Sequence, residues 1–75
     1  MTKTIQIEKI REVVNFVAAA SKVTGDVYAR KGESKVVVDG KSLMGMFSID
    51  PSSPITIEYP AGEMDFEEFL VQFEV

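Results

Sequence analysis

The sequence contains neither histidine nor cysteine among its 75 residues. The absence of cysteine excludes disulfides and thiol chemistry, and the lack of both residue types argues against a zinc site. Tryptophan is also absent, and no apolar run approaches the ~20 residues that a transmembrane helix requires. Residues 1–6 lack the apolar core of a signal peptide. We therefore expect a cytoplasmic protein without a membrane segment, a metal or a cofactor.

Basic residues are missing from the second half of the chain. All eight Lys and Arg residues lie within 1–41, together with five acidic residues, whereas 42–75 carry seven acids and no base. Residues 1–41 therefore have a net charge of +3, and residues 42–75 have a net charge of −7. Nucleic-acid binding requires clustered basic residues, so an acidic domain with two arginines argues against it. A protein partner with a basic patch is the simpler expectation.

The spacing of apolar residues predicts one domain, over 1–75, with four strands and three helices. Alternation with a period of two predicts strands over 4–7 and 55–59. The segments 26–30 and 34–38 are predicted to be two further strands, joined as a hairpin. A period of three to four residues predicts helices over 8–22 and 63–74. Their apolar faces are expected to supply core side chains: Ile10, Val13, Val17, Phe66, Phe69, Leu70 and Phe73. With a short helix over 42–48, the order is βαββαβα. This is an α+β open-faced sandwich, an antiparallel sheet with both long helices on one face.

The segment after the hairpin holds the strongest candidate for a site. Ser42 is well placed as a helix N-cap, because its hydroxyl can accept a hydrogen bond from a backbone N–H one turn on. Gly45 limits this helix to about two turns. Four large apolar residues follow Ser42, namely Leu43, Met44, Met46 and Phe47. So short a helix can bury only one side, so part of the cluster should face solvent, as partner surfaces do. We expect Met44 to be the most exposed, with Leu43 or Phe47 partly exposed beside it; simple core packing of the cluster is the alternative.

The stretch Lys41-Ser42-Leu43-Met44-Gly45-Met46 resembles the regulatory-serine segment of HPr, the small histidine-containing phosphocarrier of the bacterial sugar phosphotransferase system. Met44 and Gly45 match that pattern directly, Leu43 matches conservatively, and Ser42 stands where the family carries its regulatory phosphoserine. Ala20-Ser21-Lys22 is a second, weaker match near the end of the first helix. With a connection two residues longer between these segments, the resemblance covers essentially the whole chain. It implies the same βαββαβα fold.

The family carries phosphate on a histidine at the start of the first helix, followed by alanine, arginine and proline. Lys9-Ile10-Arg11-Glu12 falls on that motif, and only Arg11 matches it. Lysine, with a usual pKa of about 10.4, is protonated and is not a nucleophile, and a serine phosphate is too stable to be passed on readily. We therefore expect neither enzymatic activity nor a phosphocarrier role. Arg11 would aid a phosphate site in the family, but a solvated helix arginine is the simpler interpretation here.

Ser42 has two compatible interpretations, a helix cap and a phosphoacceptor for a kinase of the type that acts on HPr, with Lys41 adjacent to pair with the phosphate. In the family, residues matching Leu43, Met44 and Phe47 help to form the docking face for protein partners. The resemblance thus implies a histidine-lacking HPr of the catabolite-repression type, as in Gram-positive bacteria, acting as a non-catalytic regulator or adaptor. Its partners would be a kinase or regulator of the sugar phosphotransferase system. The alternative is a plain protein-interaction domain without phosphorylation or a role in sugar uptake. Neither interpretation involves a nucleic acid, a membrane or a small-molecule substrate.

Overall fold

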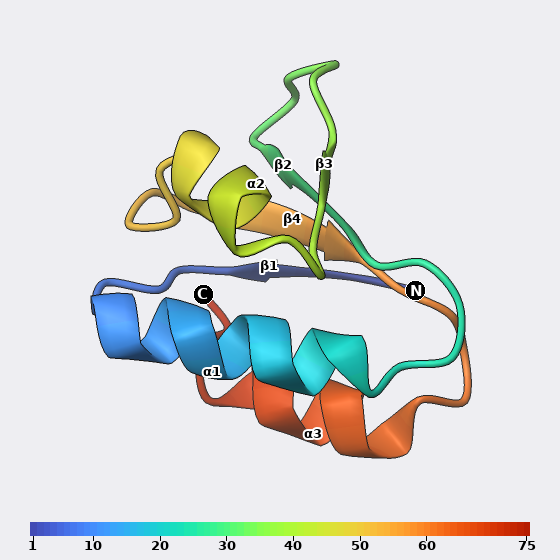
Figure 1. Ribbon diagram of the computed structural model, residues 1–75. Helices are drawn as coiled ribbons and strands as arrows, with labels where there is room; N and C mark the ends of the chain where they lie inside the picture. Colours follow the sequence, from blue (N-terminus) through green and yellow to red (C-terminus); the bar gives the residue numbers. More distant parts are fainter.

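The computed structural model describes all 75 residues and contains the seven elements in the predicted order (Figure 1). They are β1 (Thr2–Ile5), α1 (Ile10–Ser21), β2 (Tyr28–Lys31), β3 (Val38–Asp39), α2 (Leu43–Ser48), β4 (Ile55–Glu58) and α3 (Met64–Val71). The strands form one antiparallel sheet with the order β1-β4-β2-β3. The predicted α+β fold is therefore confirmed. None of the three helices combines the length and the apolar character that a membrane span would need.

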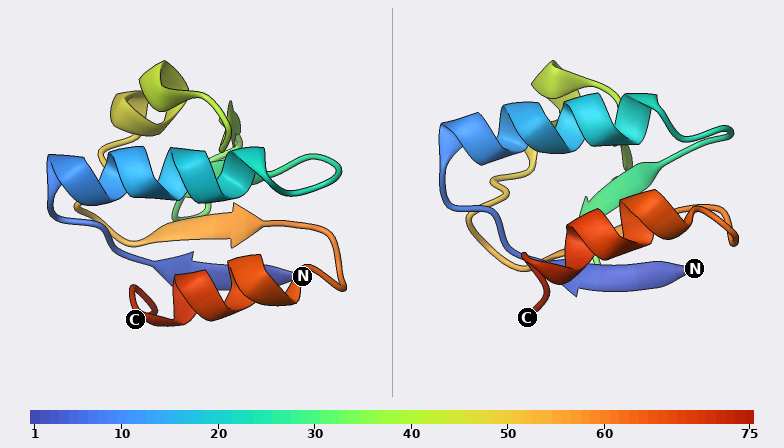
Figure 2. Two further views of the ribbon diagram at one scale, coloured as in Figure 1. Left: turned by 60° about the horizontal axis from the view of Figure 1, so that its bottom comes forward. Right: turned by 90° about the horizontal axis from the view of Figure 1, so that it is seen from below.

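Both α1 and α3 lie on the same face of the sheet, as two views from the helix side show (Figure 2). The strand register explains this arrangement, because Ile5 lies opposite Ile55, and Ile57 lies opposite Ala29. Residues directly opposite each other project to the same side, so these side chains form one apolar face. That face belongs to a core of 15 buried residues: Ile5, Ile7, Val13, Phe16, Ala20, Val23, Val27, Ala29, Met46, Ile49, Ile55, Ile57, Tyr59, Phe66 and Leu70.

The apolar stripe of α1 is centred differently from the prediction. Ile10, expected in the core, is 72% exposed, whereas Phe16, which the predicted stripe omits, is fully buried. The bulk of the Phe16 ring explains the difference, because burying it turns the helix away from the side on which Ile10 and Val14 lie. Phe16 then packs against Phe66 of α3, with ring centroids 5.8 Å apart.

The hairpin of β2 and β3 has fewer paired residues and a longer connecting loop than predicted. A strand over 34–38 was expected, but only Val38 and Asp39 pair with β2. Local bonds compete with the ladder at Ser34, whose N–H donates to the Lys31 carbonyl at 3.0 Å and whose hydroxyl accepts from the N–H of Val36 at 3.1 Å. The side chains of Val36 and Val37 consequently remain exposed.

The first strand and the last helix are also shifted from their predicted ranges. β1 covers residues 2–5 rather than 4–7, although Ile5 and Ile7 are both buried, as the alternation predicts. α3 ends at Val71, and the residues after it run along the outer edge of β1. There the N–H of Gln6 donates to the Phe73 carbonyl at 3.0 Å, and the N–H of Val75 donates to the Thr4 carbonyl at 3.1 Å. The C-terminal residues thus cover one edge of the sheet.

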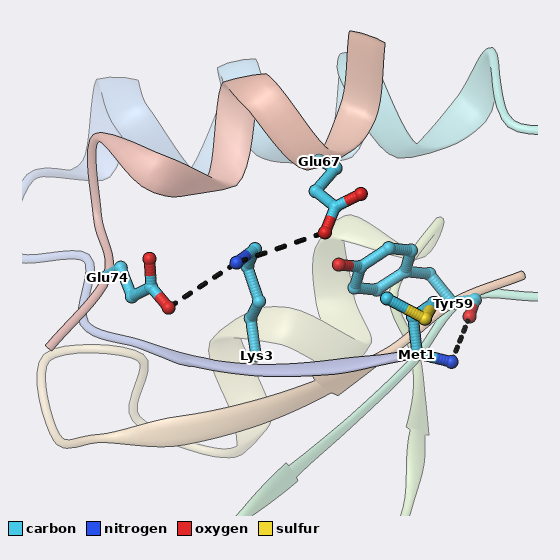
Figure 3. A network of polar contacts seen from close by, with 5 residues as sticks. All are labelled: Met1, Lys3, Tyr59, Glu67 and Glu74. Atoms are coloured by element: carbon cyan, nitrogen blue, oxygen red, sulfur yellow. Dashed lines mark hydrogen bonds and ion pairs between the residues drawn. The ribbon is translucent and has the colours of Figure 1, made fainter. Parts of the chain in front are cut away.

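A lysine and two carboxylates connect β1 to α3. The ammonium group of Lys3 lies 3.4 Å from the Glu74 carboxylate and 4.0 Å from that of Glu67 (Figure 3). Beside them the Tyr59 side chain is buried against Phe66 in an edge-to-face arrangement, with centroids 5.5 Å apart. The hydroxyl of Tyr59 is buried without a hydrogen-bond partner. Burial and, next, the carboxylate of Glu67 raise the pKa of Tyr59 above its usual value of 10.0.

Candidate protein-docking surface

α2 begins at a serine cap, as predicted. The backbone of Ser42 is extended, and its hydroxyl accepts a hydrogen bond from the N–H of Gly45 at 3.1 Å. The carbonyl of Ser42 then accepts the first helical bond, from the N–H of Met46 at 2.9 Å. Asp50, just beyond the end of α2, has a positive φ of 52°, a conformation that aspartate tolerates better than most residues. The chain therefore closes this helix after six residues.

The two sides of α2 differ sharply in exposure. Met46 is fully buried in the core, together with Ile49 just after the helix. Met44 is 85% exposed, and Leu43 and Phe47 are about half-exposed, at 40% and 42%. The prediction that Met44 is the most exposed of the four apolar residues is confirmed. Met46 anchors the helix, and the side chains on the other side are left free.

Exposed apolar side chains continue from α2 onto the first turns of α1, against which α2 packs. Ile10 and Val14 are spaced four residues apart and so share one side of α1. Both are exposed, and Ile10 lines an open depression of about 270 Å³ together with Lys9 and Phe47. We call the exposed set the α1–α2 surface, consisting of Ile10, Val14, Leu43, Met44 and Phe47.

Lys9 occupies the N-cap position of α1 but makes no side-chain cap. Its backbone is extended, and its carbonyl accepts bonds from the N–H groups of Glu12 at 2.9 Å and Val13 at 3.2 Å. The side chain of Lys9 is exposed at the wall of the depression. Arg11 is also exposed, lies outside the lining of that depression, and forms no ion pair. The backbone alone therefore starts α1, and both cations remain free.

An acidic side chain, Asp50, also lines the same depression. The hydroxyl of Ser52 donates to the Asp50 carboxylate and lowers the pKa of Asp50, with a smaller contribution from Lys31, whose ammonium lies 3.7 Å away. Asp50 thus stays ionised, and the depression carries both charge signs around apolar Ile10 and Phe47. No three acidic side chains converge in a way that could hold a metal ion.

Lys41 does not lie as the sequence suggested. Its ammonium donates to the Val23 carbonyl at 2.8 Å, just beyond the C-terminal end of α1, instead of remaining free beside Ser42. Because Lys41 lies near the end of α1 and Phe47 near its start, α2 runs antiparallel to α1. Ser42 and Lys9 therefore stand at opposite ends of the α1–α2 surface.

The structure brings some of the predicted site residues together and leaves others apart. Lys9 and Phe47 line one depression; Leu43 and Met44 belong to the same helix, with Ser42 at its start; Arg11 stands apart on α1. Ile10 and Val14 were not predicted as surface residues. The phenylalanine at position 16 is the signal that could have identified them, because it shifts the buried side of α1.

The fold defines the class of protein that this chain resembles. It is an α+β open-faced sandwich like that of solved HPr phosphocarrier structures. The sequence itself matches no protein-family model and no curated protein.

Two solved structures carry the likeness. The crystal structure of HPr-C-His from Thermoanaerobacter tengcongensis has a TM-score of 0.75 at 24% identity, over 96% of this chain and 88% of that chain. The crystal structure of a phosphocarrier protein HPr from Bacillus anthracis str. Ames has a TM-score of 0.68 at 23% identity, over 99% of this chain and 96% of that chain. At these identities the likeness establishes the HPr-like fold and leaves activity to be argued from the residues.

Proposed function

We propose that this chain is an HPr-like protein without the phosphocarrier histidine, acting as a non-catalytic regulator or adaptor that docks other proteins on its α1–α2 surface. The observation that carries the proposal is the 85% exposure of Met44 on a helix that Met46 holds in the core. An apolar side chain so exposed gains nothing for folding, whereas methionine suits a docking surface because it repacks easily against different partners. The HPr-like fold supports a relation to the sugar phosphotransferase system and to its kinases and regulators as partners.

The residues at the start of α1 support a role without phosphate transfer. Lys9 is at the position that the sequence resemblance assigns to the family's histidine, and its ammonium is exposed. An exposed ammonium near neutral pH has no lone pair with which to accept phosphate. Incubation with phosphoenolpyruvate and the general enzyme of the phosphotransferase system should therefore leave no acid-labile phosphate on the chain. Stoichiometric labile phosphate on any residue would contradict the proposal.

Docking on the α1–α2 surface is testable with two matched methionines. Met44 on α2 and Met64 on α3 are both highly exposed, at 85% and 78%, but only Met44 belongs to the proposed surface. We expect Met44→Lys to weaken binding to a kinase or regulator of the phosphotransferase type, measured by calorimetric titration. Met64→Lys should bind as the parent does, and circular dichroism should show both variants folded. Equal affinities of the two variants would remove the α1–α2 surface from the proposal.

Phosphorylation of Ser42 is the regulatory component of the proposal. The hydroxyl is half-buried and already accepts the N–H of Gly45, so a phosphate would keep an acceptor there and add about two negative charges beside Leu43. Because Lys41 is bound to the Val23 carbonyl, an arginine of the partner is the natural counter-charge. A kinase of the HPr type should place acid-stable phosphate on the parent and on Ser48→Ala, but not on Ser42→Ala. Equal labelling of all three chains would exclude Ser42.

The engagement of Lys41 also favours a second candidate function, a plain protein-interaction domain with no phosphorylation. In that case the α1–α2 surface binds its partner unmodified, and Met44→Lys still weakens binding. The kinase assay on Ser42 distinguishes the two candidates, and the calorimetric titration tests what they share.

A further inference from the structure

The two edges of the sheet are treated differently. The outer edge of β1 is covered by the C-terminal residues, through the bonds that Gln6 and Val75 make there. The outer edge of β3 has no such cover, since β3 is the last strand in the order β1-β4-β2-β3. An open strand edge presents unpaired backbone groups to any chain that can add a strand.

The register shows which backbone groups are free on the β3 edge. Ala29 lies opposite Val38, and the N–H of Gly40 donates to the Val27 carbonyl at 2.7 Å. Residues 38 and 40 therefore bond inward to β2, and the alternation of an antiparallel ladder directs the N–H and C=O of residues 37 and 39 outward. Val37 makes none of the backbone bonds found outside the helices and strands.

The side chains continue the strand pattern beyond the last paired residue. Val38 packs against the core, whereas Val37 lines a small depression on the opposite face of the sheet with Tyr28 and Arg30. Val36 and Val37 are exposed at 66% and 47%, and the tip of their hairpin points away from α1 and α3 (Figure 1). Both residues are β-branched, and a strand added at this edge would give them the pairing that β2 does not.

The charge pattern of this edge is complementary to itself. We propose that Lys35-Val36-Val37-Val38-Asp39 pairs antiparallel with the same segment of a second copy of this chain. Centred on Val37, the pairing places Lys35 of each copy opposite Asp39 of the other, and Val36 opposite Val38. Opposite charges in directly opposed positions stabilise antiparallel strands. The contact is isologous, so it closes as a dimer, and its two sheets join into one.

The backbone groups fit this register. In this register the N–H and C=O of Val37 bond to the same groups of the second copy. The N–H of Asp39 reaches the carbonyl of the second copy's Lys35 when the bend that the chain makes at Lys35 straightens on pairing. The carbonyl of Asp39 already accepts the N–H of Ser42 at 3.0 Å, which keeps the ladder short. An interface made by one five-residue segment of each copy belongs to the small, weak class of protein interfaces, so the dimer forms only at high protein concentration. The proposed dimer uses none of the residues of the α1–α2 surface, so its test is independent of the test of docking on that surface.

A charge exchange tests the register. Sedimentation velocity at protein concentrations up to about 1 mM should show a monomer–dimer equilibrium in the parent. Lys35→Asp turns both cross-strand pairs into like charges and should raise the dimer Kd about tenfold. Asp39→Lys should do the same, and an equimolar mixture of the two variants should restore the parent affinity, because opposite charges then face each other at both ends.

Two further variants keep the test interpretable. Asp39 also accepts the N–H of Lys41 at 2.9 Å, so circular dichroism must show Asp39→Lys folded, and Asp39→Asn removes the charge while keeping an acceptor. If Asp39→Lys unfolds, a raised Kd in Asp39→Asn takes its place. Lys22→Asp, a charge reversal at the end of α1, should leave the Kd unchanged. A monomer at every concentration, as expected if the edge serves another protein's strand, overturns the proposal. So does a dimer unaffected by the changes at Lys35 and Asp39.

Discussion

Met44 and Met46 stand two residues apart on α2 and test the division of this helix into a buried and an exposed side. Met46 is fully buried in the core cluster, so Met46→Ala removes buried atoms and leaves a cavity, at a cost of about 2–5 kcal/mol. Met44 is 85% exposed, so Met44→Ala should change the free energy of unfolding by no more than about 0.5 kcal/mol. The two substitutions remove the same atoms, so the difference reports burial alone.

The effect of Met46→Ala should be large relative to the whole molecule. A domain of 75 residues has a free energy of unfolding of about 4–11 kcal/mol, so this single change removes a substantial fraction of it. The midpoint of thermal unfolding should fall by about 8 °C or more, against about 4 °C at most for Met44→Ala. Urea unfolding followed by circular dichroism gives the free energies directly. Equal losses in the two variants, or a larger loss in Met44→Ala, would refute the assignment of the two sides.

Three further measurements test the local chemistry. Ser42→Ala should lower the free energy of unfolding by about 1 kcal/mol through loss of the hydrogen bond from the N–H of Gly45. Ser42→Asp should lower it less, since aspartate also caps a helix. Equal and severe losses of both variants in urea unfolding would mean that Ser42 acts by packing. Tyr59→Phe should be neutral or stabilising by up to about 1 kcal/mol, because the buried hydroxyl has no partner; a clear loss would reveal one. The pKa of Tyr59 is raised in the folded state, so the contribution of its neutral hydroxyl to stability is complete below pH 10 and is lost as the pH rises through the folded pKa. Tyr59→Phe should therefore resist alkaline unfolding better than the parent. Equal midpoints of alkaline unfolding would contradict this prediction.

The element order could be predicted because periodicity and local chemistry agree over most of the chain. The cap of α2 is set by residues within one turn, Ser42 and Gly45, so its prediction needed no tertiary information. The exposure of Met44 followed from counting four large apolar residues against one helix side. Both features are determined by residues that are close in the sequence, so they could be predicted from the sequence alone.

The errors arise where distant residues decide the outcome. β1 lies two residues earlier than predicted, in a register set by pairing with β4 and the C-terminal residues, which periodicity does not reveal. The ammonium of Lys41 donates to the carbonyl of Val23, 18 residues away, and no local sequence pattern predicts this hydrogen bond. The strand over 34–38 failed for a local reason, the bonds made by Ser34, which outweighed the β-propensity of three valines.

The two positions that matter most for the proposed function differ in what the fold requires of them. At Lys9 only the backbone starts α1, and the side chain makes no cap, so the fold does not depend on which side chain stands there. At Ser42 the side chain itself caps α2, and α2 supports Met44 above the buried Met46. A chain with this fold can therefore lack phosphate-carrying chemistry at position 9 and keep α1 intact, whereas loss of the hydroxyl at position 42 weakens the helix that presents the proposed docking residues. This asymmetry is why a docking protein without a carrier histidine is physically consistent with the HPr-like fold.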